Sequence, residues 1–173
     1  MRIALVSDTH LPRFGRQLAR ALVEGLEAAD VDRILHAGDW TDPIAVDLLQ
    51  AIAPIDGVAG NNDGPALHER FGTKLELVVG GVRIGVTHGH LGPGRTTEER
   101  ATRAFEDEGE TRPDAIVFGH SHIPMIRHLP GGRWLINPGS PTDKRRQPDC
   151  TWALMEIEGG AIASVELVRF ERR

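Results

Sequence analysis

Side chains that could bind metal ions recur along this chain, each group placed directly after a short apolar segment. They are Asp8, His10, Asp39, Asn61, His88, His90, His120 and His122. Asp, Asn and His offer oxygen and nitrogen donors, which suit Mn²⁺, Fe, Zn²⁺, Ni²⁺ or Co²⁺ and suit Ca²⁺ poorly because of the imidazoles. Even without His90, these are too many ligands for one ion. A carboxylate that bridges two ions would use them, and a pair of ions about 3.5–4 Å apart can clamp the oxygens of a phosphoryl displacement.

The apolar segments in the first part of the chain alternate between strand and helix patterns. The predicted elements are a strand at 2–6, a helix at 16–29, a strand at 33–36, a helix capped by Thr41 or Asp42 with Pro43 in its first turn, and a strand at 52–58. Such alternation favours a largely parallel sheet with crossover helices. Ligands bind outside the carboxyl ends of the strands in sheets of this kind, so loops far apart in sequence can converge on one site.

The second part of the chain is predicted to be richer in hairpins. Its predicted elements are strands at 75–79 and 82–87 joined by Gly80-Gly81, a helix opened by Thr96 or Thr97, strands at 114–118, 125–128 and 133–136, and a final hairpin of 152–157 and 161–170. Thr96 and Glu99 have the spacing of a capping box. We therefore expect an α/β fold of two mixed sheets packed together, with helices on the outside.

Composition narrows the class of protein. The 173 residues, 40% apolar and 26% charged, suit one globular domain spanning 1–173. The net charge of −5 and the lack of a basic stripe predict no dedicated nucleic-acid surface, although a nucleotide substrate stays open. Cys150 is the single cysteine, so an internal disulfide is excluded. No signal peptide or membrane span of about 20 apolar residues is apparent, and we expect a cytoplasmic protein with no membrane partner.

Five short motifs carry a resemblance to a known family. In chain order they are Asp8-Thr9-His10, Gly38-Asp39, Gly60-Asn61-Asn62-Asp63, Thr87-His88-Gly89-His90 and Gly119-His120-Ser121-His122. Together they resemble the calcineurin-like metallophosphoesterases. The short chain and Asn137-Pro138-Gly139-Ser140 are similar to the small single-domain bacterial and archaeal phosphodiesterases of that family. The resemblance implies a four-layer sandwich of two mixed β-sheets flanked by helices.

The resemblance also implies a role for each ligand. Asp8, His10 and His122 would hold one divalent ion, and a second would be held by Asn61, His88 and His120, with Asp39 bridging the two. Mn²⁺ is the expected metal, with Ni²⁺, Fe, Zn²⁺ and Co²⁺ as alternatives. A metal-bound hydroxide would attack the phosphorus of a small phosphate ester, a diester above all, and the residues expected to take part in catalysis are Asp39, Asn61 and His90.

One position departs from the family pattern. Where much of the family has a His that can assist the leaving group, this chain has Asn62. An amide has no proton to give at neutral pH, so hydrolysis is expected to depend strongly on the pKa of the leaving group. Two roles for His90 stay open: it could supply the missing proton or contact the substrate phosphate.

Several alternatives remain at this point. The same ions would serve a phosphomonoesterase or a nucleotide pyrophosphatase, and the same fold can serve as a non-catalytic scaffold for protein interactions. A homodimer also stays open. His36 lies in a predicted strand and is expected to be a core or supporting histidine, while Trp40 could equally wall a substrate pocket or pack in the core.

Overall fold

Alternate side chains of the first strand, β1 (Arg2–Val6), enter two different cores in the computed structural model, which describes residues 1–106 and 112–171. Ile3 and Leu5 point into one core, and Ala4 and Val6 point into the other. A strand that is buried on both faces needs apolar residues at every position. This explains why the sequence reads here as a continuous apolar run.

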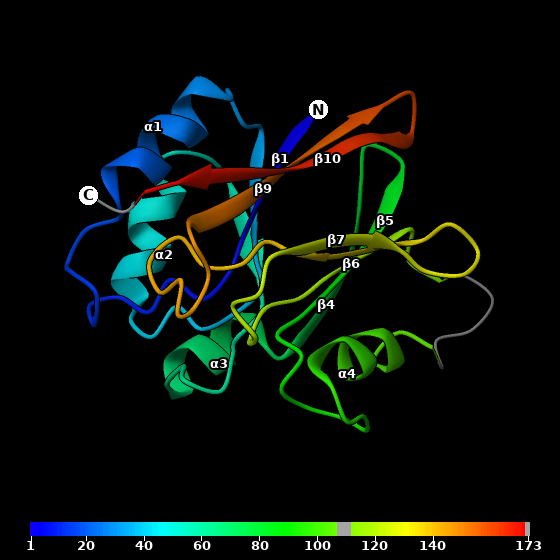
Figure 1. Ribbon diagram of the computed structural model, residues 1–173, viewed down its shortest axis with the longest axis horizontal. Coiled ribbons are helices and arrows are strands. Elements are labelled where there is room, and N and C mark those ends of the chain that lie inside the picture. Colours follow the sequence, from blue (N-terminus) through cyan, green and yellow to red (C-terminus); the bar gives the residue numbers. More distant parts are fainter. Residues whose placement is uncertain (107–111, 172–173) are drawn as a thin grey trace.

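The described residues contain two five-stranded sheets and four helices (Figure 1). The other strands are β2 (Arg33–His36), β3 (Ile55–Gly57), β4 (Lys74–Val79), β5 (Val82–Thr87), β6 (Ala115–Val117), β7 (Met125–His128), β8 (Trp134–Asn137), β9 (Cys150–Glu158) and β10 (Ala161–Phe170). The helices are α1 (Arg20–Ala28), α2 (Pro43–Gln50), α3 (Pro65–Phe71) and α4 (Thr97–Arg103).

Both sheets are mixed. The first has the order β10-β9-β1-β2-β3. In it β1, β2 and β3 are parallel, β9 is antiparallel to β1, and β10 is antiparallel to β9. The second has the order β4-β5-β6-β8-β7, with β5, β6 and β8 parallel and an antiparallel strand at each edge. The parallel strands of each sheet end at the same edge, which brings the loops that follow them together.

Three apolar clusters separate four layers, as predicted. The central cluster joins the facing sides of the two sheets, with Leu35 of β2 and Val86 of β5 among its members. A second cluster packs α1, α2 and α3 on the outer face of the first sheet, and a third packs α4 on the outer face of the second. Figure 1 shows α1 and α2 on one side of the sheets and α4 on the other. The layers are therefore helix, sheet, sheet and helix.

Both helix-capping predictions are confirmed, with one difference. The Asp42 carboxylate accepts a hydrogen bond from the N–H of Ile44 at 2.9 Å, and Thr96 Oγ1 accepts one from the N–H of Glu99 at 3.1 Å. The capping box does not close on Thr96, because Glu99 Oε2 accepts from the N–H of Arg95 instead.

The predicted helix at 16–29 and strand at 52–58 are longer than the elements that form. Leu18 is buried in the same core as α1 although it precedes the helix. Its spacing from the apolar residues of α1 therefore reflected its burial and did not mean that the backbone at Leu18 is helical. At the start of the predicted strand, Ile52 donates its N–H to the carbonyl of Leu49. The chain there is still leaving α2, and β3 begins only at Ile55.

Helix α3 was not predicted. It has seven residues, and Leu67 is its buried one, so no apolar stripe marks it. Its boundaries nevertheless carry ordinary signals, because Pro65 occupies the first turn and Gly72 follows the last residue with a φ of 62°. These are the residues that helix starts and ends favour.

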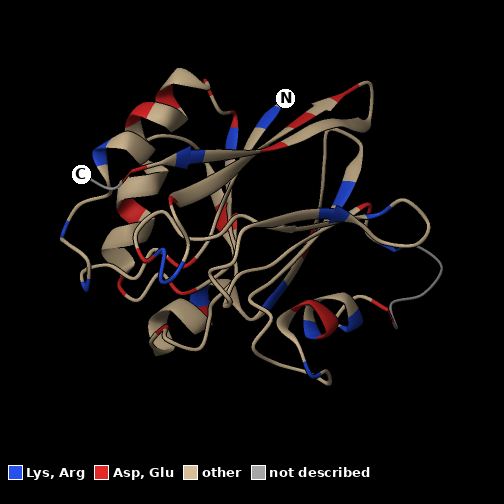
Figure 2. Ribbon diagram, viewed as in Figure 1, with Lys and Arg blue, Asp and Glu red and all other residues tan. Residues whose placement is uncertain are grey.

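The surface carries charges of both signs. Figure 2 shows acidic and basic residues interspersed along the helices and strands. Among the described residues, no helix is both long and apolar enough to span a bilayer.

Candidate metal centre

The loops after β1, β2, β3, β5 and β6 meet at the carboxyl ends of their strands. They bring together side chains from opposite ends of the chain: His10 Nε2 lies 3.3 Å from His122 Nε2, although 112 positions separate the two residues. The rings of His88 and His120 lie 5.2 Å apart between centroids. The convergence expected from the strand pattern is therefore observed.

The backbone of these loops is held in an unusual conformation. A positive φ occurs at five of the predicted ligands, namely Asp8 (56°), His10 (46°), Asp39 (59°), His120 (67°) and His122 (59°). Residues other than glycine adopt this region rarely, although Asp and His tolerate it better than most. Such strain clusters where a fold holds side chains in a required direction, and here it occurs in the loops that follow β1, β2 and β6.

The first group of donors consists of Asp8, His10 and His122. Asp8 Oδ1 lies 3.2 Å from His122 Nε2 and 3.7 Å from His10 Nε2. All three residues are buried, and their donor atoms lie within 4.8 Å of one another. This is the group predicted to hold the first ion.

The second group consists of Asp39, His88 and again Asp8. Asp39 Oδ2 lies 3.3 Å from His88 Nε2 and 3.7 Å from His10 Nε2. The donor atoms of this group also lie within 4.8 Å of one another. Asp8 therefore belongs to both groups, and Asp39 lies beside the first group through His10.

Carbonyl groups fix the orientation of the two central imidazoles. His88 Nδ1 donates to the carbonyl oxygen of Ala37 at 2.7 Å, and His122 Nδ1 donates to that of Asp143 at 2.6 Å. A carbonyl can only accept, so the proton of each neutral ring is on Nδ1 and the Nε2 lone pair faces the cluster. Outer hydrogen bonds of this kind are typical of metal-binding histidines.

The carboxylate of Asp8 is held in the same way. Its Oδ2 accepts hydrogen bonds from Ser7 Oγ at 2.7 Å and from the N–H of His120 at 3.0 Å. The other oxygen, Oδ1, faces His10 and His122. One oxygen is thus used for orientation, and the other is left for the cluster.

The charges within the cluster reinforce one another. Burial alone would raise the pKa of Asp8, but the imidazoles of His10 and His122 beside its Oδ1 outweigh this effect and hold the pKa well below its ordinary value. Burial also opposes ionisation of Asp39, yet contacts with His88 and Asn62 lower its pKa to about 2. Both carboxylates are consequently ionised at neutral pH and attract positive charge.

The imidazoles respond to those carboxylates. Burial opposes protonation of His88, but the carboxylate of Asp39 beside its Nε2 raises its pKa. The same balance, with Asp8 as partner, raises the pKa of His122. The buried cluster thus favours cationic charge at the points where the Nε2 atoms lie.

The residues present fit a metal ion. Asp8 Oδ1 and His88 Nε2 are buried without a hydrogen-bond partner among the described residues, and leaving a buried polar atom unpaired costs about 1–3 kcal/mol. A cation between them would satisfy both. The donors are nitrogen and oxygen only, which suits borderline divalent metals. The protein is therefore equipped to bind divalent metal through Asp8, His10, Asp39, His88 and His122.

The remaining predicted residues are less buried than the members of the two donor groups. Asn61 is exposed on the loop after β3, and His120 and His90 are half-buried. The His90 ring lies 5.2 Å from that of His88. Burial, together with the neighbouring His88, lowers the pKa of His90 to about 4.

His36 and Trp40 belong to the packing beneath the site. The Trp40 ring stacks on His36 at 3.6 Å and on Phe71 at 4.9 Å, and both Trp40 and His36 are fully buried. His36 Nδ1 accepts the N–H of Gly38 at 3.1 Å, and burial lowers the pKa of His36 to about 3. His36 is thus a supporting histidine, and Trp40 packs in the core and does not line a pocket.

Sequence reasoning missed several residues that support the site. Asp143 orients His122 through its carbonyl, Ser140 Oγ donates to the carbonyl of Asp8 at 2.7 Å, and Thr142 Oγ1 donates to that of Thr9 at 2.6 Å. These contacts span more than a hundred positions, except for that of Asp143. Ser140 was near a signal, because it ends the Asn137-Pro138-Gly139-Ser140 segment that carries part of the family resemblance.

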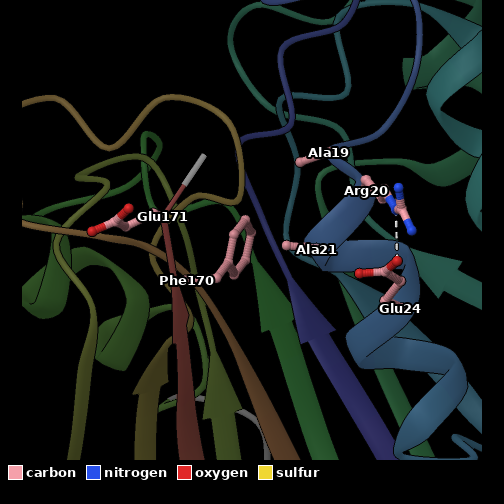
Figure 3. A pocket seen from close by; sticks show the side chains of 6 residues that line it. All are labelled: Ala19, Arg20, Ala21, Glu24, Phe170 and Glu171. Atoms are coloured by element: carbon pink, nitrogen blue, oxygen red, sulfur yellow. Dashed lines mark hydrogen bonds and ion pairs between the residues drawn. The ribbon is translucent and has the colours of Figure 1, made fainter. Parts of the chain in front are cut away.

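A separate hollow lies between α1 and the end of β10 (Figure 3). Its volume is about 570 Å³, and its lining consists of Ala19, Arg20, Ala21, Glu24, Phe170 and Glu171. Arg20 and Glu24 are paired with each other across one helical turn. The lining includes no member of the polar cluster, so the hollow is not part of the candidate metal centre.

Comparison with known proteins agrees with this geometry. Residues 1–160 match the model of the calcineurin-like phosphoesterase superfamily domain. A probable metallophosphoesterase of Methanothermobacter thermautotrophicus is 32% identical over 169 residues, which cover 98% of this chain and 92% of that protein.

Solved structures share the fold. Vps29 of Chaetomium thermophilum superposes with a TM-score of 0.78 at 18% identity, and Vps29 of Entamoeba histolytica complexed with Zn²⁺ with 0.75 at 20%, each match covering all of both chains. At these identities the likeness concerns the fold alone. The family match, the curated relative and the two overlapping donor groups lead to one conclusion: this chain belongs to the calcineurin-like phosphoesterase superfamily.

Proposed function

We propose that this chain is a phosphodiesterase that uses two divalent transition metal ions, Mn²⁺ foremost, to hydrolyse a small phosphate diester, for which a nucleotide derivative is one candidate. Family membership and the candidate ligands support a metal-dependent phosphoesterase. The proposal adds to this the number of ions, two, and the preference for diesters. The observation that carries the proposal is the pair of buried donor groups that share Asp8.

Each part of the cluster has a definable task. The ionised carboxylates of Asp8 and Asp39 would receive the cations, and the Nε2 atoms of His10, His88 and His122 would complete the two groups. Asn61 and His120 are proposed to add donors on the open side. Bound ions would supply Lewis acidity, because a metal pair can activate a water molecule and offset the charge of phosphate oxygens.

His90 is proposed to face the substrate and not a metal. It is half-buried at the margin of the cluster, and its ring centroid lies 5.2 Å from that of His88 and 6.2 Å from that of His120. From this place it would hydrogen-bond a phosphate oxygen or the leaving group. The preference for diesters rests on the resemblance to the small single-domain phosphodiesterases.

The test is hydrolysis of bis(p-nitrophenyl) phosphate by chelator-stripped protein, with Mn²⁺, Ni²⁺, Co²⁺, Zn²⁺ or Mg²⁺ added back singly. The monoester p-nitrophenyl phosphate is assayed in parallel. Turnover that a transition metal restores, faster on the diester, is the expected result. A faster monoester reaction would contradict the diester preference and leave the metal-dependent phosphoesterase in place.

A matched pair of variants tests the assigned role of Asp39. Asp39→Asn removes the charge of the carboxylate that the family resemblance implies as the bridge between the ions, while Asp30→Asn makes the same change at an exposed residue after α1 that also has a positive φ of 49°. Asn accepts this backbone conformation, so both variants should fold. We expect turnover to fall by orders of magnitude in the first and to be unchanged in the second. Equal activity in both would reject the role.

A non-catalytic scaffold is the second candidate, and the likeness in fold to Vps29 favours it. Under this alternative the cluster would bind metal only to stabilise the native state. Folded, metal-loaded protein that turns over neither ester with any of the five metals would move the assignment to the scaffold.

A further inference from the structure

A single neighbouring residue donates hydrogen bonds to both oxygens of the Asp39 carboxylate. The N–H of Asn62 donates to Asp39 Oδ1 at 2.8 Å, and the side-chain amide of Asn62 donates to Asp39 Oδ2 at 2.6 Å. Oδ2 is the oxygen that faces His88 and His10. Both oxygens of this ligand are therefore oriented by one residue of the loop after β3.

The backbone of Asp39 is held by the same loop. Asp63 Oδ2 accepts hydrogen bonds from the N–H groups of Asp39 at 2.9 Å and of Gly60 at 2.7 Å. Asp63 Oδ1 accepts one from the N–H of Thr41 at 2.6 Å. The backbone at Asp39 and Thr41 is thus hydrogen-bonded to the loop after β3, and these bonds hold Asp39 in its positive-φ conformation.

The loop can lie this close because of Gly60. A Cβ at Gly60 would come within 2.2 Å of Asp39 Oδ1, which no real contact permits. Residues 60–63 therefore pack closely around Asp39. Asn62 hydrogen-bonds its carboxylate, Asp63 hydrogen-bonds its backbone, and Gly60 has no side chain that would clash with it.

Position 62 offers hydrogen-bond donors and no acid. A carboxamide cannot release a proton at neutral pH, but its NH₂ group can donate to a carboxylate. Hydrogen bonds to an ionised acceptor are stronger than neutral ones, and a neutral donor leaves the negative charge of Asp39 intact for a cation. The chemistry at this position thus serves to aim a ligand.

We infer that Asn62 is a positioning residue that aims Asp39 Oδ2 at the metal site and thereby sets metal affinity. This inference rests on the proposed metal-binding role of Asp39. Residues that orient metal ligands typically change metal affinity or activity about 10- to 100-fold when they are removed, and a loss of that size is expected here.

The experiment is a titration of chelator-stripped protein with Co²⁺, followed by its visible absorption. Asn62→Ala removes the side-chain amide and keeps the backbone N–H. Gln50→Ala removes an exposed amide on α2, whose oxygen accepts from Arg70, and serves as the matched control. We expect Asn62→Ala to bind Co²⁺ about 10- to 100-fold more weakly and with an altered spectrum, and Gln50→Ala to match the wild type.

A second variant covers the case in which Asn62→Ala is poorly folded. Asn62→Asp keeps the shape of the side chain, but the ionised carboxylate at position 62 cannot donate a hydrogen bond to Asp39. The Co²⁺ spectrum of this variant should therefore also differ from that of the wild type. Wild-type affinity and spectrum in folded Asn62→Ala, or a wild-type spectrum in Asn62→Asp, would overturn the inference. Wild-type protein that binds no Co²⁺ would instead refute the metal-binding function on which it rests.

Discussion

The close fit between Gly60 and Asp39 can be tested by adding one methyl group. In Gly60→Ala the new Cβ would lie 2.2 Å from Asp39 Oδ1, 2.6 Å from Asp39 N and 2.8 Å from Asp39 Cγ. Real Cβ contacts essentially never fall below 3.0 Å and are ordinary from 3.4 Å, so the Cβ and this carboxylate oxygen must separate by a further 0.8 to 1.2 Å. A shift of this size would strain its hydrogen bond from the Asn62 N–H, now 2.8 Å, because such bonds rarely exceed about 3.2 Å.

The cost follows from the size of this displacement. Forcing an extra methyl group into a packed site typically destabilises a protein by about 1–3 kcal/mol. For a chain of this length each kcal/mol lowers Tm by roughly 2–4 °C, so we expect Tm to fall by roughly 2–12 °C. Because the displaced atom belongs to a proposed ligand, metal affinity should fall as well.

Gly64→Ala is the matched control for this prediction. It makes the same change on the same loop, but a Cβ at Gly64 meets nothing within 4 Å, and its φ of −76° suits any residue. Thermal unfolding of both variants without metal and Co²⁺ titration of both supply the comparison. If Gly60→Ala matched Gly64→Ala in Tm and in metal affinity, the conclusion that position 60 packs too closely on Asp39 to accept a side chain would be refuted.

The other two predictions concern proton transfer and the core. Because Asn62 has no proton to give, rates for a series of aryl phosphate diesters should fall steeply as the pKa of the leaving phenol rises, and Asn62→His should flatten that dependence by supplying an acid. Trp40→Phe should lower the free energy of unfolding by about 1–3 kcal/mol, since it leaves the carbonyl of Val58 without its donor, now Trp40 Nε1 at 2.8 Å.

Each of these has an outcome that contradicts it. A flat dependence on the leaving group in the wild type would mean that another residue supplies the proton. For the core, Trp152→Phe is the control, because the indole N–H of this buried residue has no partner among the described residues. Urea denaturation that showed equal destabilisation of both variants would assign the cost to lost volume and none to the hydrogen bond of Trp40.

The sequence was sufficient for features that depend on local pattern and motif order. A run of apolar residues on both faces of a strand, as in β1, predicts a buried strand whatever surrounds it. Helix α2 was predictable because Asp42 and Pro43 act within its own first turn. Helix α3 could not be predicted in this way, because it lacks an apolar stripe. Leu18 has the apolar spacing of a helix and is buried, yet it lies outside α1.

The sequence by itself thus determined the alternation of strands and helices and the kinds of ligand at the strand ends. The tertiary structure alone decided how those ligands face one another, because contacts such as His10 with His122 cross 112 positions and leave no local signal. It also decided what Asn62 touches: the sequence established that its amide is no acid, and only the packing of the β3 loop against β2 brings that amide to the carboxylate of Asp39.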